Sequence, residues 1–219
     1  MYTNSIPTMI ILLFLFAYLL GSIPTAVWVS KKYYGFDIRE VGSGNAGATN
    51  AFRVLGTKTG VVVLFIDMLK GALAVKLAYL STFSFGSIAF TNLQIGLGLL
   101  AVIGHIFPVF AEFKGGKGIA TLFGLILGIQ PLVALSLVAV FLFILVLTKY
   151  VSVSSMIASI AFPIMILFVF KEPELSYRLF AIATALLVIL THHKNIQRLI
   201  KGCENKVNLF KKKDTDANR

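Results

Sequence analysis

The chain has 219 residues, of which 58% are hydrophobic, and its mean hydropathy is +0.89. This composition predicts an integral membrane protein of one domain and excludes a separate soluble core. A net charge of +11 would suit a protein that binds nucleic acid. We reject that function, because the basic residues lie at the ends of apolar segments and no aromatic stacking platform accompanies them. Cys203 is the only cysteine, which excludes an internal disulfide and a thiolate metal cluster.

Seven apolar segments follow along the chain, and each is expected to be helical because lipid offers backbone groups no other partner. The expected spans cover residues 6–30, 58–81, 91–111, 118–130, 131–148, 152–170 and 175–193. The segment 118–130 is short, because thirteen residues at about 1.5 Å each reach roughly 20 Å of a ~30 Å hydrocarbon core. Pro131 ends it, so five full spans plus a re-entrant pair is the alternative architecture.

The basic residues predict the orientation of these spans. With the N-terminus outside, the cytoplasmic segments are 31–57, 112–117, 149–151 and 194–219. Together with Lys58 at the boundary, they hold 16 of the 20 Lys and Arg residues, and the others are Lys70, Lys76, Lys171 and Arg178. We therefore expect one transmembrane domain over residues 1–206, in a plasma (inner) membrane, and a basic cytoplasmic tail over residues 207–219 that meets anionic membrane lipids.

The first cytoplasmic segment contains a glycine-rich loop, Gly42–Arg53, with the sequence GSGNAGATNAFR. Glycine lets backbone amides approach an anion, and arginine offers a bidentate fork to phosphate. The loop matches G-x-G-x-x-G in form, but no strand precedes it, so a dinucleotide site is rejected. The expected phosphate-site residues are Ser43, Gly44, Asn45, Gly47, Thr49, Asn50 and Arg53. The alternative is a polar connecting turn with an arginine at the membrane boundary.

Ionisable residues also occur inside the expected spans. Asp67 and Lys70 are three positions apart, which predicts an ion pair that neutralises both charges. His105 is expected to be a buried, hydrogen-bonded helix residue and not part of the site. Because the three histidines lack metal-ligand spacing, neither a zinc site nor a cofactor is indicated.

The second glycine-rich loop reads Lys114-Gly115-Gly116-Lys117-Gly118 and opens the short span. We expect both ammonium groups and the three glycine amides to hold an anion at this positive helix end. It is not a Walker A loop, because no G-x-x-x-x-G-K-[ST] string occurs. The alternative is a flexible turn whose lysines follow the positive-inside rule.

A third polar motif, THHKNIQRLIKGCE, runs from Thr191 to Glu204 at the end of the last span. His192, Asn195 and Arg198 are spaced by three, so they are expected to share one helix face and to belong to the site. His193 is expected to point elsewhere. Glu204 follows Gly202 and is expected to cap the helix or to pair with Arg198.

These motifs resemble the bacterial acyl-phosphate:glycerol-3-phosphate acyltransferases of the PlsY type, over residues 1 to about 206. The resemblance rests on GSGNAGATNAFR, FKGGKGIAT and HHKNIQRLIKGCE in that order, with GSIPTA (Gly21–Ala26) in the first span. It implies acyl transfer from an acyl phosphate to the 1-position of glycerol-3-phosphate, giving lysophosphatidic acid and phosphate at the cytoplasmic face.

The expected mechanism is direct attack by the glycerol-3-phosphate hydroxyl, with no acyl-enzyme. Ser43, Arg53, His192 and Asn195 are the expected catalytic residues, and either a substrate phosphate oxygen or His192 takes the proton. Which loop holds which phosphate stays open, although the resemblance favours glycerol-3-phosphate at the second loop. Two rival functions are a transporter or channel for a phosphorylated solute and a non-catalytic lipid-binding subunit. No histidine is followed five residues later by aspartate, so a histidine–aspartate dyad is excluded.

Overall fold

The computed structural model describes residues 5–207, and every regular element in that range is helical. The α-helices of this range are α1 (Ser5–Gly21), α2 (Thr25–Tyr34), α3 (Ala48–Val54), α4 (Thr57–Lys76), α5 (Ile88–Ile106), α6 (Ile119–Ile129), α7 (Pro131–Thr148), α8 (Val151–Ile164), α9 (Leu175–Thr191) and α10 (His193–Ile200). The shorter helical turns are η1 (Ile38–Glu40), η2 (Leu77–Leu80), η3 (Val109–Ala111) and η4 (Met165–Val169). The all-α class is confirmed. The expected basic tail lies outside the described residues beyond Val207.

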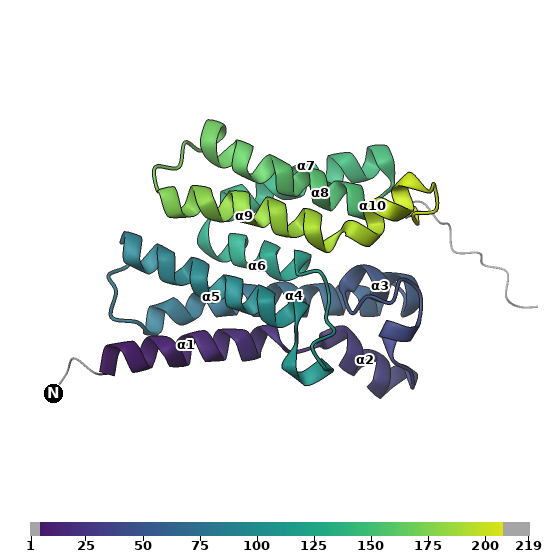
Figure 1. Ribbon diagram of the computed structural model, residues 1–219, viewed down its shortest axis with the longest axis horizontal. Coiled ribbons are helices and arrows are strands. Elements are labelled where there is room, and N and C mark those ends of the chain that lie inside the picture. Colours follow the sequence, from purple (N-terminus) through teal and green to yellow (C-terminus); the bar gives the residue numbers. More distant parts are fainter. Residues whose placement is uncertain (1–4, 208–219) are drawn as a thin grey trace, which may run out of the picture.

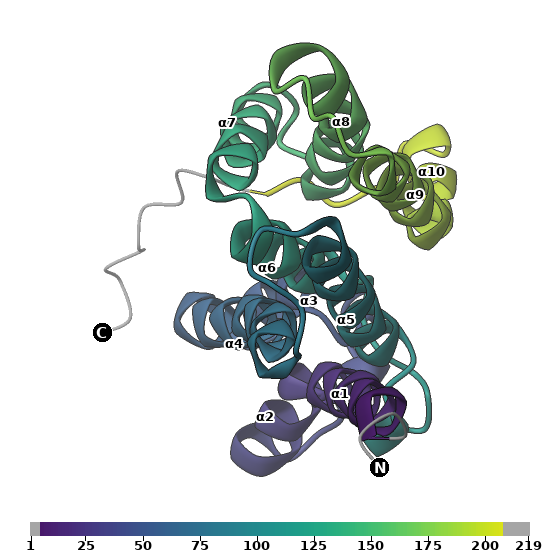
Figure 2. The same ribbon diagram turned by 90° about the vertical axis from the view of Figure 1, so that its left-hand side faces the viewer.

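The long helices run side by side in two groups (Figure 1). Seen along their axes in Figure 2, α1, α4 and α5 form one group, α7, α8 and α9 form the other, and α6 lies between them. Buried Phe162, Tyr177 and Phe180 pack edge to face inside the second group. Helix α6 contacts α4 and α5 on one side and α7 on the other, so this short helix joins the two groups.

Small residues allow α4 and α6 to pack closely. A Cβ atom at Gly71 would lie 2.1 Å from the carbonyl oxygen of Thr121, and one at Gly124 would lie 1.9 Å from that of Met68. Backbones that approach so closely leave no room for a side chain, as at many helix interfaces in membranes. The eleven residues of α6 are therefore held by close backbone contact with α4.

Two expected spans are broken helices. The span expected over 6–30 ends at Gly21 and restarts at Thr25, because Pro24 lacks the amide that would continue α1. The span expected over 175–193 ends at Thr191, where α9 and α10 meet at an angle of 56°. By length and composition, four helical stretches of the described range could cross a membrane, or five if α9 and α10 form one span.

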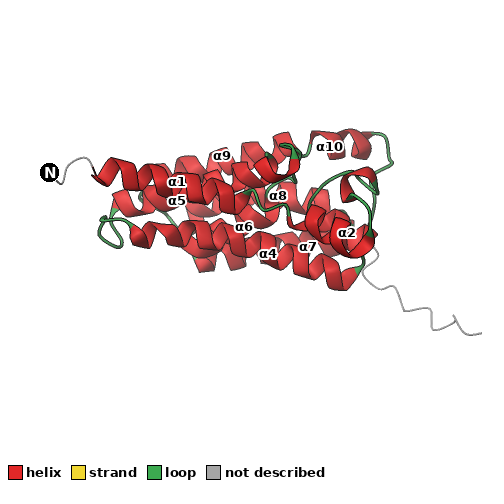
Figure 3. Ribbon diagram, turned by 90° about the horizontal axis from the view of Figure 1, so that it is seen from below, coloured by secondary structure: helices red, strands yellow, loops and turns green. Residues whose placement is uncertain are grey.

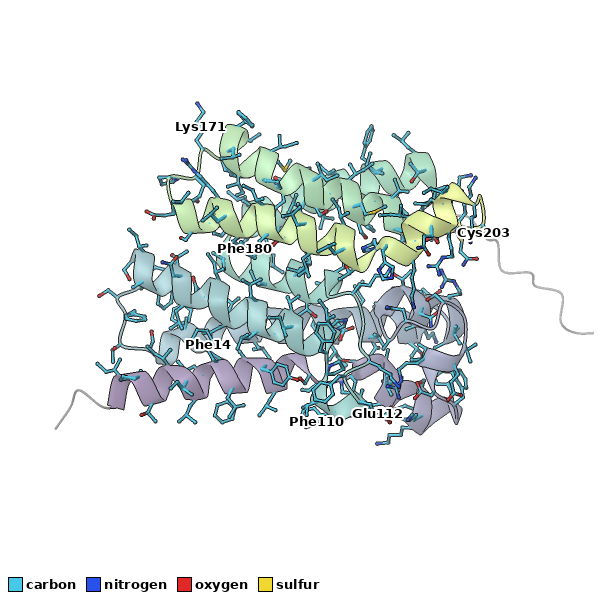
Figure 4. All side chains as sticks on the ribbon, in the orientation of Figure 1. Phe14, Phe110, Glu112, Lys171, Phe180 and Cys203 are labelled. Carbon is cyan, nitrogen blue, oxygen red and sulfur yellow. The ribbon has the colours of Figure 1, made fainter. Side chains whose placement is uncertain are left out.

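All three polar motifs lie at the same end of the helices. Figure 3 places α2 and α10 together at the end opposite the start of α1, and Figure 1 places α3 there as well. In Figure 4, Glu112 and Cys203 lie toward this end, whereas Lys171 lies at the other. The fold therefore collects segments that are far apart in sequence on one face of the protein.

Candidate active site

The first glycine-rich loop is organised around the side chain of Asn50, which is 1% exposed. Its Oδ1 accepts hydrogen bonds from the Ser43 amide (2.9 Å) and from Nη1 of Arg53 (3.3 Å). Its Nδ2 donates to the carbonyl groups of Ile38 and Val41 at 3.1 and 3.0 Å. Both amide hydrogens are thus engaged within the protein. In this structure the amide group of Asn50 holds the loop in shape, and its expected contact with phosphate stays a prediction.

Gly42 and Gly44 both adopt the left-handed backbone conformation, with φ of +67° and +72°. A Cβ atom at Gly42 would also lie 2.4 Å from Oδ1 of Asn50, so only glycine fits there. Ser43 and Asn45 are half-buried, whereas Thr49 and Arg53 are exposed. Gly47 precedes the first turn of α3 as its N-cap.

Arg39 connects the region of the first loop with the second. Its guanidinium group donates to both carboxylate oxygens of Asp37 and, through Nη1, to the carbonyl of Ala111 at 2.9 Å. Hydrogen bonds from Arg39 hold the pKa of Asp37 well below its usual range, and Lys31 forms a further ion pair at 3.1 Å. The sequence did not predict the hydrogen bond between Arg39 and Ala111, because Ala111 is 72 positions further along the chain and contributes only its carbonyl.

A cavity of about 440 Å³ lies between the two glycine-rich loops. Its lining residues are Asp37, Arg39, Glu40, Gly44, Glu112, Lys114 and Gly115. Three of the expected site residues therefore meet at this cavity: Gly44 from the first loop, and Lys114 and Gly115 from the second. Lys114 is exposed and lies 3.8 Å from Glu112.

The amides of the second loop are used differently from what its composition predicts. The Gly115 amide donates to the carbonyl of Ile106, and the Gly116 amide donates to that of His105, both at 3.1 Å. Both amides are thus engaged by α5 in this structure, and their expected role in holding an anion stays a prediction. A Cβ atom at Gly115 would lie 2.0 Å from the His105 carbonyl oxygen, so close packing on α5 explains the glycine. Gly118 has a φ of +81° and forms the N-cap of α6.

Lys117 joins the second loop to the third motif. Its ammonium group donates to Oδ1 of Asn195. Burial lowers the pKa of Lys117 to about 8, and the nearby positive charges of Arg198 and Arg53 contribute, while Glu204 opposes the shift. Each of the three motifs thus contributes a cation to one place. Such a cluster is suited to a phosphate dianion, which relieves the repulsion among the three charges.

Glu204 holds the polar side of α10 in place. Its Oε2 accepts a hydrogen bond from Nε of Arg198 at 2.7 Å, which confirms the expected pair. Its Oε1 accepts from Nδ2 of Asn195 (2.6 Å) and from the Ser152 hydroxyl (2.8 Å). Burial alone would raise the pKa of Glu204, but these three hydrogen bonds lower it. Sequence reasoning missed Ser152, since nothing distinguishes it from the other serines of α8.

His192 lies where α9 ends and is 3% exposed. Its Nδ1 is 2.8 Å from the carbonyl oxygen of Val188, which can only accept, so Nδ1 carries the proton. The lone pair of the neutral ring is then on Nε2. Asn195 is also buried, and His193 is exposed as expected. His192 is the N-cap of α10, and Asn195 and Arg198 lie on one face of that helix, since both donate to Glu204.

The ion pair expected inside the second span is confirmed. Nζ of Lys70 lies 3.0 Å from Oδ1 of Asp67, and both side chains are buried. The expected burial of His105 is confirmed as well.

Comparisons with known proteins agree on one family. The family model described as "Glycerol-3-phosphate acyltransferase" matches residues 11–202. A glycerol-3-phosphate acyltransferase of Chlorobium limicola is 41% identical, and the alignment covers 89% of this chain and 95% of that protein. One of Chlorobaculum parvum is 43% identical, with coverage of 87% and 93%.

Solved structures give the same result. The crystal structure of PlsY (YgiH), an integral membrane glycerol 3-phosphate acyltransferase, in its glycerol 3-phosphate form is 39% identical with a TM-score of 0.82, covering 91% of this chain and 96% of that one. Its lysophosphatidic acid form gives a TM-score of 0.79, with coverage of 91% and 95%.

Proposed function

The chain belongs to the glycerol-3-phosphate acyltransferase family, and we propose that it transfers a fatty acyl group from an acyl phosphate to the 1-hydroxyl of glycerol-3-phosphate. The products are lysophosphatidic acid and phosphate. The observation that carries this proposal is the hydrogen bond from Lys117 to Asn195, together with the effect of Arg53 and Arg198, from the first and third motifs, on the pKa of Lys117. A reaction between two phosphorylated molecules needs such a concentration of cations in one place.

Both glycine-rich loops supply cations for two phosphorylated substrates. Arg53 belongs to the first loop, Lys114 and Lys117 belong to the second, and the charges of Arg53 and Arg198 both act on Lys117. The solved relatives, described as glycerol 3-phosphate and lysophosphatidic acid forms, support the acceptor and the product. We assign glycerol-3-phosphate to the loop that contains Lys114 and Lys117. The acyl phosphate then lies toward Ser43 and Arg53, with its fatty chain among the membrane lipids.

The reaction follows from the chemistry of the donor. The 1-hydroxyl oxygen of glycerol-3-phosphate attacks the acyl carbonyl carbon, and the bond from that carbon to the phosphate oxygen breaks. Phosphate is a good leaving group, so no acyl-enzyme is required. Lysine and arginine charges stabilise the negative charge that develops on the carbonyl and phosphate oxygens. The hydroxyl proton passes to an oxygen of the departing phosphate, and Nε2 of His192 is the competing acceptor.

The membrane arrangement is part of the proposal. We propose seven spans, with α4 and α6 crossing despite the charges of the former and the shortness of the latter. The N-terminus is outside, and residues 1–206 form one domain of the bacterial inner membrane. The three motifs then face the cytoplasm, which is consistent with the distribution of Lys and Arg. The tail then meets anionic lipid at the same face.

The first test uses purified protein with labelled glycerol-3-phosphate, offered either acyl phosphate or acyl-CoA. We expect labelled lysophosphatidic acid from acyl phosphate alone, with release of one phosphate for each product molecule. Product from acyl-CoA alone would replace the proposed donor. Uptake of label into sealed vesicles without any acylation would instead favour the transporter.

A further inference from the structure

A buried polar cluster lies behind the second glycine-rich loop, between the break of α1 and α2 and the middle of α4. Oδ1 of Asp67 accepts a hydrogen bond from the Thr25 hydroxyl (3.0 Å) and lies 3.0 Å from Nζ of Lys70. Nδ1 of His105, from α5, is 3.6 Å from the same oxygen. All four side chains are buried. Ionisable groups at such depth are costly, and those that persist in membrane proteins commonly serve function.

The break between α1 and α2 accounts for the contacts of Lys70 and Thr25 in this cluster. In the turn between α1 and α2, the carbonyl of Ile23 accepts hydrogen bonds from the Thr25 amide at 3.1 Å and from Nζ of Lys70 at 2.9 Å. The Thr25 hydroxyl ties the start of α2 to Asp67. Lys70 neutralises Asp67 within this arrangement, so the carboxylate does not need His105 as a counter-charge. The imidazole therefore needs a different explanation.

The other side of the imidazole packs on the loop. A Cβ atom at Gly116 would lie 2.1 Å from Nε2 of His105, so the ring rests against the glycine itself. The carbonyl of His105 also accepts the Gly116 amide. His105 thus contacts this residue of the loop through both its ring and its backbone, and the next residue is Lys117, whose ammonium meets Asn195.

We propose that His105 is a positioning residue for the anion-binding loop, and that Asp67 orients its ring. At 3.6 Å the negative charge of the carboxylate attracts an Nδ1–H, so it favours the tautomer with the proton on Nδ1 and the ring orientation that turns Nδ1 toward Asp67. The fixed ring and the carbonyl of the same residue then set the path of Gly116, and with it the place of the Lys117 ammonium. The inference rests on the proposed function, since it gives that loop the phosphate of glycerol-3-phosphate.

Positioning of this kind changes substrate affinity more than chemistry. A shift of about 1 Å in a binding group can cost up to roughly a hundredfold in rate or affinity. We expect His105→Ala to raise the KM and the Kd for glycerol-3-phosphate about tenfold or more, while the KM for acyl phosphate changes less than about threefold. His193→Ala is the matched control, because His193 is exposed at the same end of the protein.

Two double variants test the contact itself. Gly116→Ala introduces a methyl group against Nε2 of His105, so it should raise the KM for glycerol-3-phosphate strongly. In the His105→Ala background the methyl group has room, and the same substitution should add little. Asp67→Asn keeps the shape and the acceptor for Thr25 but removes the charge. It also leaves Lys70 without its counter-charge, so thermal unfolding measures the loss of folded protein separately. In the protein that remains folded, it should raise this KM in the parent and add little once His105 is alanine.

Several readouts decide between positioning and a general structural role. Kd for glycerol-3-phosphate by calorimetry needs no turnover, and thermal unfolding with Gly128→Ala on α6 as the glycine control measures the loss of folded protein. A loss of folded protein equal to that of Gly128→Ala, with unchanged Kd and KM in the protein that remains folded, would overturn the proposal. Additive effects of Gly116→Ala and His105→Ala on KM would overturn it as well. A change confined to acyl phosphate would support positioning and overturn the assignment of substrates to loops. If the parent binds glycerol-3-phosphate without acylating it, the proposed function fails while the Kd values still test His105.

Discussion

The ammonium group of Lys117 donates a hydrogen bond to the side-chain oxygen of Asn195, 78 positions further along the chain. This contact brings the second glycine-rich loop to the start of α10, and Glu204 holds the other end of the same amide. The two motifs therefore form one unit: Asn195 holds the ammonium group of Lys117 in place, and Glu204 holds the amide of Asn195.

The lowered pKa of Lys117 leads to a prediction of how activity depends on pH. Its pKa is lowered to about 8, so its ammonium is charged below that pH and loses its proton above it. The second pKa of a phosphate monoester is about 6, so the substrate dianion forms as the pH rises through that value. We expect kcat/KM for glycerol-3-phosphate to rise through about pH 6 and to fall above about pH 8.

The variant Lys117→Arg provides the control for this profile. A guanidinium group stays charged throughout the range, so the fall at alkaline pH should disappear whatever the absolute rate. The bound dianion also favours the ammonium, so kcat of the parent should remain constant to higher pH than kcat/KM. A parent profile without an alkaline fall, or an arginine variant that retains it, would contradict the role of Lys117.

Arg53 is exposed in the structure and should bind substrate phosphate, or the charge that develops on it, directly. Arg53→Ala should lower kcat/KM by roughly 10²–10³-fold, as expected for removal of a donor that stabilises developing charge. Arg53→Lys keeps the charge and loses the bidentate geometry, so its rate should fall between those of alanine and arginine. Steady-state rates with acyl phosphate give the comparison. Near-normal turnover of the alanine variant would remove Arg53 from the site.

His192→Gln tests whether the protein or the substrate takes the proton. Glutamine can replace a neutral imidazole as a hydrogen-bonding group but is not a general base. If the leaving phosphate accepts the proton, the variant should keep kcat within about tenfold and retain the shape of the pH profile. A loss of kcat of more than about a hundredfold, with the limb near pH 6 from the substrate phosphate still present in kcat/KM, would identify His192 as the base.

Glu204→Ala should destabilise the protein as well as slow it. The substitution removes the acceptor from Arg198, Asn195 and Ser152, and a hydrogen bond to a charged group contributes roughly 1–3 kcal/mol. Because the pKa of Glu204 is lowered in the folded protein, this contribution is present at neutral pH and is lost as the pH falls through that pKa. Thermal unfolding in detergent at neutral and acidic pH measures it. The exposed Glu40→Gln is the matched control and should change stability by less than about 0.5 kcal/mol.

The sequence by itself determined the helical class, the family and the residues of the three motifs. Apolar segments must be helical in lipid, and the order of the glycine-rich loops and the histidine motif is a local property of the chain. The spacing of Asp67 and Lys70 was enough to predict their ion pair, because three positions along a helix place two side chains together. The pairing of Glu204 with Arg198 was one of two expectations, because Gly202 lets the chain turn after the helix and brings Glu204 back toward it.

Only the tertiary structure decided which groups are free to bind a ligand. The sequence does not reveal that the amides of Gly115 and Gly116 are engaged by α5, or that the Asn50 side chain is engaged within its own loop. It also could not place His105 between Asp67 and Gly116, or Lys117 beside Asn195. Each of these contacts depends on how helices far apart in the chain pack together. A hydrogen bond already made within the protein is not available to a substrate, so the packing determines which residues of a motif form the site.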